Sequence, residues 1–179
     1  MNIALVGCVK GKRSEACAAA DLYTSPLFVL SRRYAERFDA WAILSARHGL
    51  LMPGTQVGPY EETLTTMKAE QVRAWWSMVG RQLREAWPGC GMTWDPTFTC
   101  LAGSRYLGCM TGLRYRDPMR RFGIGERLRW LKVASEHGDV DAAACCAHGA
   151  SRHQGGGRCD VPGCTCLHLI TELHRTRRA

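Results

Sequence analysis

Several side chains suited to polar chemistry follow a short apolar run in the first half of the chain. Residues 42–44, Ala-Ile-Leu, have the composition of a buried strand. Ser45, Arg47 and His48 come directly after it, so a hydroxyl, a guanidinium and an imidazole lie close together in the sequence. In open α/β sheets, ligands bind beyond the carboxyl ends of the strands. We therefore expect a binding or catalytic site at this strand exit.

Two other predicted strands also end in polar groups. Residues 2–7 predict a first strand, and Lys10 lies in the glycine-containing loop that follows it. Residues 97–102 predict another strand, with Ser104 and Arg105 shortly after its end. We expect the three exits to form one rim, where Lys10 supplies a positive charge and Ser104 a hydroxyl.

Candidate acid–base residues lie beside these exits. Asp21 comes just before a predicted helix, and Tyr60, Glu61 and Glu62 follow a Pro-Gly turn at residues 53–54. A carboxylate at such a rim can act as a general acid or base, or can stabilise positive charge that develops on a substrate. We favour Glu61 among these candidates. For each carboxylate, an ordinary solvated or hydrogen-bonding role is an equally good interpretation.

The elements that must position these groups predict an α/β fold. A helix between the first two strands completes a β-α-β unit, and a long helix is expected from Thr65 or Thr66 to about Trp87. We expect a compact domain over residues 1–137, with a mixed or parallel central sheet flanked by helices. A small Cys/His-rich element should follow over residues 138–179.

The chain carries a formal net charge of +8, and arginine supplies much of the excess. The planar guanidinium donates two hydrogen bonds to a phosphate, so DNA is the expected partner. An arginine-rich composition without such a partner is the alternative interpretation. No stretch approaches the roughly 18 apolar residues of a membrane helix, and the chain begins without a basic leader, so a cytoplasmic protein is expected.

Residues 119–132 combine a glycine turn with several arginines. Gly123 and Gly125 precede an amphipathic segment and resemble the turn of a helix-hairpin-helix motif, where amides at a helix N-terminus bind a DNA phosphate. An ordinary loop leading into a surface helix is an equally good interpretation. The residues expected to contact nucleic acid are Lys12, Arg13, Arg47, Ser104, Arg105, Arg120, Arg121, Gly123, Gly125, Arg127 and Arg129.

The chain has 10 cysteines, and those nearest its end are crowded together. In a chain expected to be cytoplasmic, such a cluster favours a metal site over disulfides. Zinc takes four sulfur or nitrogen ligands in tetrahedral geometry, and this region has few residues that could form a core. We expect a structural zinc ion held by four of the residues Cys146, His148, Cys159, Cys164, Cys166 and His168.

A family resemblance rests on three separated blocks: the loop ending in Lys10, the segment Asp21-Leu22-Tyr23-Thr24-x-Pro26, and residues 44–53 followed by Pro59-Tyr60. Together they resemble the YaaA-like proteins, and most of all a group of bacterial and phage domains that share the central signature. The resemblance covers roughly residues 1–130. It implies a compact α/β fold with a helix-hairpin-helix-like element, affinity for DNA and an outline similar to glycosylases that handle nucleobases. The chain departs from this pattern at Glu61, where an arginine is expected, and in its cysteine-rich tail.

These features predict an enzyme that acts on a base in DNA by cleaving or exchanging an N-glycosidic bond. Such an enzyme extrudes the nucleotide, stacks its base and reads the edge of the base. Tyr60 or His48 could stack the base. Its edge could be read by Ser45, Arg47 and Ser104. Lys10 could stabilise the departing base or attack the sugar. The alternatives are a DNA-binding protein without catalysis and an enzyme that processes small nucleotides.

Metal analysis tests the zinc assignment. A region with so few core residues depends on metal for its folded state, so the purified chain should contain about one zinc ion per molecule. Elemental analysis of the purified protein measures this ratio directly. A fully folded chain that contains no metal would contradict the assignment.

Overall fold

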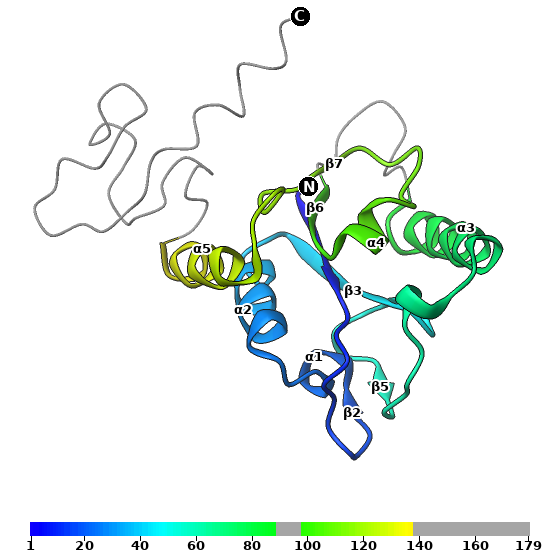
Figure 1. The fold of residues 1–179 in the computed structure, drawn as a ribbon, viewed down its shortest axis with the longest axis horizontal. Helices are drawn as coiled ribbons and strands as arrows, with labels where there is room; N and C mark the ends of the chain where they lie inside the picture. The colour runs from blue at the N-terminus through cyan, green and yellow to red at the C-terminus, as the bar shows by residue number, and fades with distance from the viewer. Residues whose placement is uncertain (89–97, 138–179) are drawn as a thin grey trace, which may run out of the picture. The chain divides into compact units, whose positions relative to one another are not determined.

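The computed structural model describes residues 1–88 and 98–137 (Figure 1). The first compact unit, Met1–Arg121, contains a five-stranded sheet in the order β4-β3-β1-β6-β7. These strands are β1 (Ile3–Gly7), β3 (Ala40–Ser45), β4 (Gly49–Leu51), β6 (Phe98–Leu101) and β7 (Tyr115–Arg116). β4 is antiparallel to β3, and the other pairs are parallel. The expected α/β class, with a mixed sheet flanked by helices, is therefore confirmed.

Three strands lie where the sequence predicts them, and they end at the same edge of the sheet. Every residue of β1 is buried, as is typical of a parallel strand covered on both faces. Val6 of β1 pairs with Ile43 of β3 and with Leu101 of β6. This register places the carboxyl ends of β1, β3 and β6 side by side.

Local capping explains where the helices begin. α2 (Pro26–Ala35) starts after Ser25, whose Oγ accepts a hydrogen bond from the Phe28 amide at 3.2 Å. α3 (Ala69–Ala86) begins later than the predicted Thr65 or Thr66, because η1 (Leu64–Thr66) forms a separate 3-10 turn there. The two short helices are α1 (Ala19–Leu22) and α4 (Ser104–Leu107).

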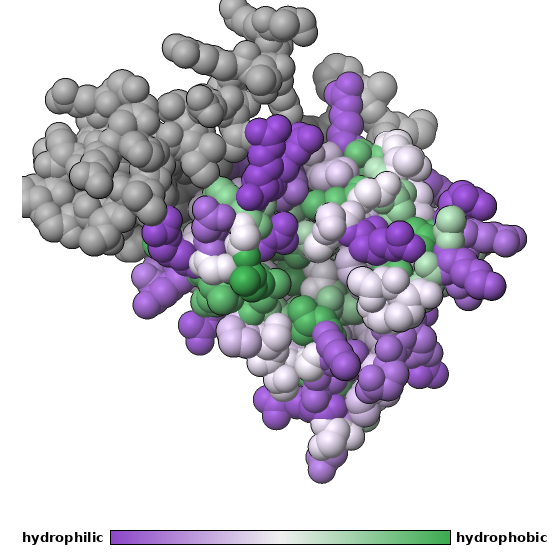
Figure 2. Space-filling view, viewed as in Figure 1, coloured by the Kyte–Doolittle hydropathy of each residue, from purple (hydrophilic) through white to green (hydrophobic). Residues whose placement is uncertain are grey.

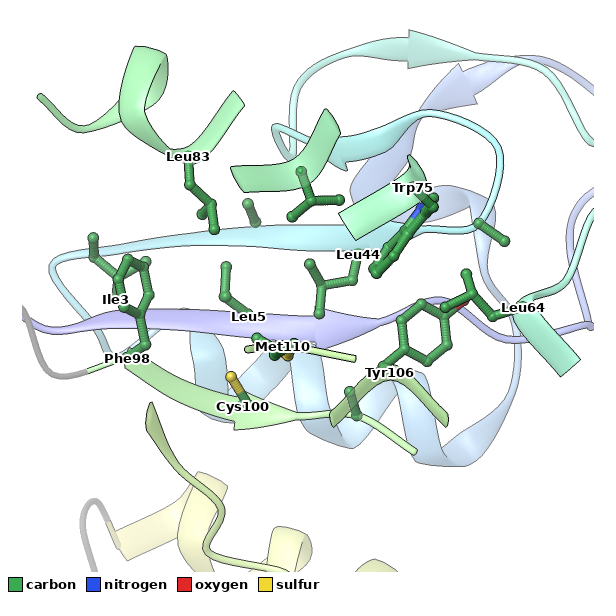
Figure 3. Packing of buried hydrophobic residues seen from close by; sticks show 14 of the residues in the cluster. Ile3, Leu5, Leu44, Leu64, Trp75, Leu83, Phe98, Cys100, Tyr106 and Met110 are labelled. Carbon is green, nitrogen blue, oxygen red and sulfur yellow. The ribbon is translucent and has the colours of Figure 1, made fainter. Parts of the chain in front are cut away.

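α3 covers one face of the sheet with its apolar side, and α2 lies on the opposite face (Figure 1). Figure 3 shows Ile3, Leu5 and Leu44 pointing from the sheet toward Trp75 and Leu83 of α3. Alternate residues of a strand face opposite sides, so these side chains share one face. Trp76, the residue after Trp75 in α3, is only half-buried.

The structure also contains a two-stranded sheet that the sequence did not predict. β2 (Cys17–Ala18) pairs antiparallel with β5 (Gln56–Val57), and the Ala19 amide donates to the Thr55 carbonyl at 2.8 Å. Strands of two residues are too short to show an alternating pattern. This small sheet brings the segment after β1 beside the segment after β4 (Figure 1).

α5 (Ile124–His137) belongs to a second compact unit, Phe122–Ala179. The structure forms the second helix of the expected helix-hairpin-helix-like element, but a turn replaces its first helix. Pro118 cannot donate a helical hydrogen bond, and Arg121 has a φ of 71°, which no right-handed helix allows. In the described part of the chain, no helix is both long and apolar enough to cross a membrane.

Gly49 provides a test of the turn between β3 and β4. Its φ of +74° favours glycine, and a Cβ there would overlap the Gln82 side-chain amide. Gly49→Ala should lower the free energy of unfolding by about 1–2 kcal/mol. Gly54→Ala is the control, because a Cβ at Gly54 meets nothing within 4 Å. Urea unfolding measures both, and equal stability of the two variants would contradict this account.

Candidate functional site

The exits of β1, β3 and β6 contribute to a cluster of hydroxyl and thiol groups, called here the hydroxyl cluster. The Tyr60 hydroxyl lies at its centre, 2.7 Å from Ser45 Oγ and 2.7 Å from the Tyr23 hydroxyl. Cys8 Sγ lies 3.0 Å from the Tyr106 hydroxyl and close enough to Tyr60 to affect its pKa. The carboxyl edge of the sheet is thus lined with polar groups from all three strand exits.

Ser45 fixes this arrangement because it is completely buried and fully hydrogen-bonded. Its Oγ accepts a hydrogen bond from the His48 amide at 3.0 Å, which holds the turn after β3. Its carbonyl accepts a hydrogen bond from Trp75 Nε1 at 2.8 Å, which ties the same point to α3. The Ser45 hydroxyl can then donate to Tyr60, and Tyr60 to Tyr23.

Burial keeps the tyrosines of the cluster protonated. It raises the pKa of Tyr23 to about 12 and also raises the pKa values of Tyr60 and Tyr106. At neutral pH all three are therefore neutral phenols that can donate hydrogen bonds, rather than phenolate bases. Partial burial, with the charge of Arg47, lowers the pKa of His48, so its imidazole is neutral as well.

The cation at the cluster is Lys12, not Lys10 as the sequence suggested. Lys12 Nζ lies 4.3 Å from the centre of the Tyr60 ring, within cation–π range, whereas Lys10 is exposed. Backbone pairing explains the difference: Lys12 forms an antiparallel bridge with Tyr23, and the Arg13 amide donates to the Leu22 carbonyl at 2.8 Å. This pairing holds Lys12 beside the tyrosines.

The candidate carboxylates lie outside the buried cluster. Asp21 accepts a hydrogen bond from Arg32 Nη1 at 2.5 Å, and Glu62 Oε1 lies 3.7 Å from Arg47 Nε. Glu61 is exposed and forms no hydrogen bond or ion pair with any residue the structure describes. The structure thus joins Ser45 to Tyr60, as expected, but leaves Lys10 and Glu61 at the surface.

The predicted phosphate site before α5 already holds a carboxylate. The Gly123 amide donates to Glu126 Oε2 at 2.7 Å, and Arg127 Nε donates to the Phe122 carbonyl at 3.0 Å. A phosphate at Gly123 would therefore have to displace Glu126. Eight of the other predicted contacts are exposed: Arg13, Arg47, Ser104, Arg105, Arg120, Arg121, Gly125 and Arg129.

Ser104 and Arg105 lie in a pocket of about 690 Å³ between α3 and α4. Arg105 is held there because its Nη2 donates to the Met67 carbonyl at 2.9 Å. Neither residue belongs to the hydroxyl cluster, although both follow β6 as predicted.

Residues 1–88 and 98–137 contain no group of three or more His, Cys, Asp or Glu side chains placed to hold a metal ion. The six predicted zinc ligands, Cys146 to His168, lie outside the described residues. The zinc site therefore stays a prediction.

Three members of the cluster, Cys8, Tyr23 and Tyr106, were not among the predicted site residues. Cys8 and Tyr106 come within a few positions of the carboxyl ends of β1 and β6, and this proximity is the signal that could have pointed to them. Tyr23 follows the short helix α1 and is far in sequence from any strand of this edge. The contact between Cys8 and Tyr106 spans 98 positions of sequence, so only the fold reveals it.

Comparison with known proteins places the chain within a family. The sequence model of a family of unknown function (DUF6884) matches residues 3–133, a range that contains the whole hydroxyl cluster. The uncharacterized protein YfjM of Bacillus subtilis (strain 168) is 36% identical over 126 residues, which cover 66% of this chain and 80% of YfjM. No solved structure matches the chain significantly.

The raised pKa of Tyr23 predicts a loss of stability in alkali. Between pH 10 and about 12 the unfolded chain releases a phenolic proton that the folded chain retains, so the free energy of unfolding falls as pH rises. In Tyr23→Phe this fall should be shallower. Urea unfolding across this pH range measures the slope. Tyr115→Phe is the comparison: burial raises the pKa of Tyr115 less than that of Tyr23, so this variant should change the slope less. An unchanged slope in Tyr23→Phe would contradict the assignment.

Proposed function

Because the chain belongs to DUF6884, a family of unknown function, its activity has to be argued from its own site, and we propose that it processes a base in DNA. The reaction would cleave or exchange the N-glycosidic bond of a nucleobase. The observation that supports this proposal is the hydroxyl cluster at the carboxyl edge of the parallel strands, with Lys12 over Tyr60.

Cleavage of an N-glycosidic bond leaves negative charge on the base and positive charge on the sugar. Neutral phenols and a nearby ammonium group suit the departing base, because both donate hydrogen bonds to developing negative charge. Tyr23 and Tyr60 supply such phenols, and Lys12 supplies the ammonium group. In this proposal Lys12 takes the role that the sequence assigned to Lys10.

The positive charge on the sugar calls for a carboxylate, and the three candidates differ in availability. Asp21 and Glu62 are each engaged by an arginine, at 2.5 Å and 3.7 Å respectively. Glu61 has no such partner among the described residues and directly follows Tyr60 in the chain. It is therefore the carboxylate we assign to stabilising the sugar or orienting the attacking water.

The charge of the chain supports a nucleic-acid substrate. The net charge is +8, and several arginines of the first compact unit are exposed. Figure 2 shows hydrophilic side chains over much of the outer side of α3. Such surface charge supplies affinity for phosphate that does not depend on sequence.

A DNA-binding protein without catalysis is the second candidate, and the burial of the cluster favours it. Ser45 has no exposed surface and Tyr60 only 3%. Both are also hydrogen-bonded within the protein. A purely structural role, in which the network holds the loops in place, would account for a closed set of hydrogen bonds of this kind. In that case the basic surface would carry the whole function, and Glu61 would be an ordinary solvated residue.

Glu61→Gln separates the two candidates. An enzyme should lose base release by about 100-fold or more, while DNA affinity stays within about twofold, because the carboxylate acts on the reaction rather than on binding. Release of free base from DNAs carrying different modified bases measures the activity, and filter binding measures the affinity.

Glu85→Gln is the matched control, since Glu85 is an exposed glutamate on α3. Full turnover in Glu61→Gln would refute the assignment of the carboxylate. A wild-type chain that binds DNA but releases no base from any of these substrates would establish the binding protein instead.

A further inference from the structure

The pocket between α3 and α4 has features of a ligand site that the base-processing proposal does not use. Its volume of about 690 Å³ is within the range of pockets that hold small organic ligands. Its wall comes from one side of α3, from the start of α4 and from the segment that follows α4 (Figure 1). None of its described lining residues belongs to the hydroxyl cluster.

Trp76 offers this pocket a fixed aromatic surface. The indole lines the pocket, is half-buried, and donates a hydrogen bond from Nε1 to the Thr111 carbonyl at 3.1 Å. Its neighbour Trp75 is buried in the core, whereas Trp76 packs against the edge of that core and leaves part of its ring open to the pocket. A held, partly open tryptophan is a surface on which a flat ring can stack.

Two arginines give the same pocket a positive charge. Arg105 is held in place because its Nε donates to the Leu64 carbonyl at 3.2 Å and its Nη2 to the Met67 carbonyl at 2.9 Å. Arg73 is exposed and forms no hydrogen bond or ion pair with a described residue. No aspartate or glutamate is among the described residues of the lining. The positive charge is therefore not neutralised within the pocket wall.

From these contacts we infer that the pocket binds a nucleoside phosphate. The base stacks on Trp76, the phosphate accepts hydrogen bonds from Arg73 and Arg105, and the hydroxyls of Ser77 and Ser104 are available to the sugar. An apolar ligand would leave both guanidinium groups unused, and a cation would be repelled by them. This inference does not depend on the reaction at the hydroxyl cluster, because it uses none of the same side chains.

Calorimetry on the full chain tests the inference with three probes: adenosine 5′-monophosphate, adenosine and inorganic phosphate. The monophosphate should bind more tightly than either part alone, because it contacts the indole and the arginines together. If the monophosphate does not bind, or binds no better than inorganic phosphate, the inference is wrong.

Substitutions then locate the site. Arg73→Gln should weaken monophosphate binding about tenfold, the usual effect of removing one charge-assisted hydrogen bond. Arg81→Gln is the matched control, because Arg81 is an exposed arginine of the same helix outside the pocket. In Trp76→Leu the monophosphate should bind no more tightly than inorganic phosphate, because the base has no ring to stack on. Trp76→Phe keeps a ring and should retain most of this difference in affinity. Equal weakening in Arg73→Gln and Arg81→Gln would overturn the inference.

The ligand of this pocket is either a free nucleotide or one nucleotide of a single-stranded nucleic acid. A short single-stranded oligonucleotide that displaces the monophosphate, with an affinity reduced in Arg73→Gln, identifies the strand as the source. An oligonucleotide that leaves monophosphate binding unchanged identifies the free nucleotide. Circular dichroism of each variant confirms that losses of binding do not arise from unfolding.

Discussion

The burial of Ser45 at the end of β3 is the constraint on which the candidate site depends. Its side chain is completely buried, while its Oγ bonds to the His48 amide and the Tyr60 hydroxyl. Its carbonyl accepts a hydrogen bond from the Trp75 indole. A buried polar group without a partner costs about 1–3 kcal/mol. Hydrogen bonds to this one residue therefore tie together three parts of the chain: the turn after β3, the segment carrying Tyr60 and the helix α3.

The small sheet of β2 and β5 and the hydroxyl cluster support each other. Strands of two residues have little stability of their own, so other contacts must hold them together. The bond between the Tyr23 and Tyr60 hydroxyls, at 2.7 Å, joins the segment after β2 to the segment after β5. The sheet in turn brings these tyrosines to the carboxyl edge of β3. The polar site is thus part of the local fold, which explains why its groups are buried and mutually hydrogen-bonded.

The sequence predicts the parts of this fold that repeat a pattern over several residues. The buried strands and the long helix α3 produce such patterns, whereas β2, β5 and β7 are only two residues long and show none. Among site residues, Ser45 was predictable because it ends a strand. Lys12 was not preferred over Lys10, because the choice depends on backbone pairing with Tyr23 that no local pattern shows. The thiol of Cys8 meets its tyrosine partner only through the tertiary fold.

Adjacent side chains of α3 and α4 serve the two sites separately. Successive residues of a helix point about 100° apart, so Trp75 can pack against Tyr106 with ring centres 5.4 Å apart while Trp76 lines the pocket. On α4, Arg105 lines the pocket, whereas the neighbouring Tyr106 reaches the thiol of Cys8. The two sites therefore lie on different sides of the same pair of helices. The packing of Trp75 on Tyr106 therefore fixes how α3 and α4 lie against each other at the hydroxyl cluster and at the pocket alike.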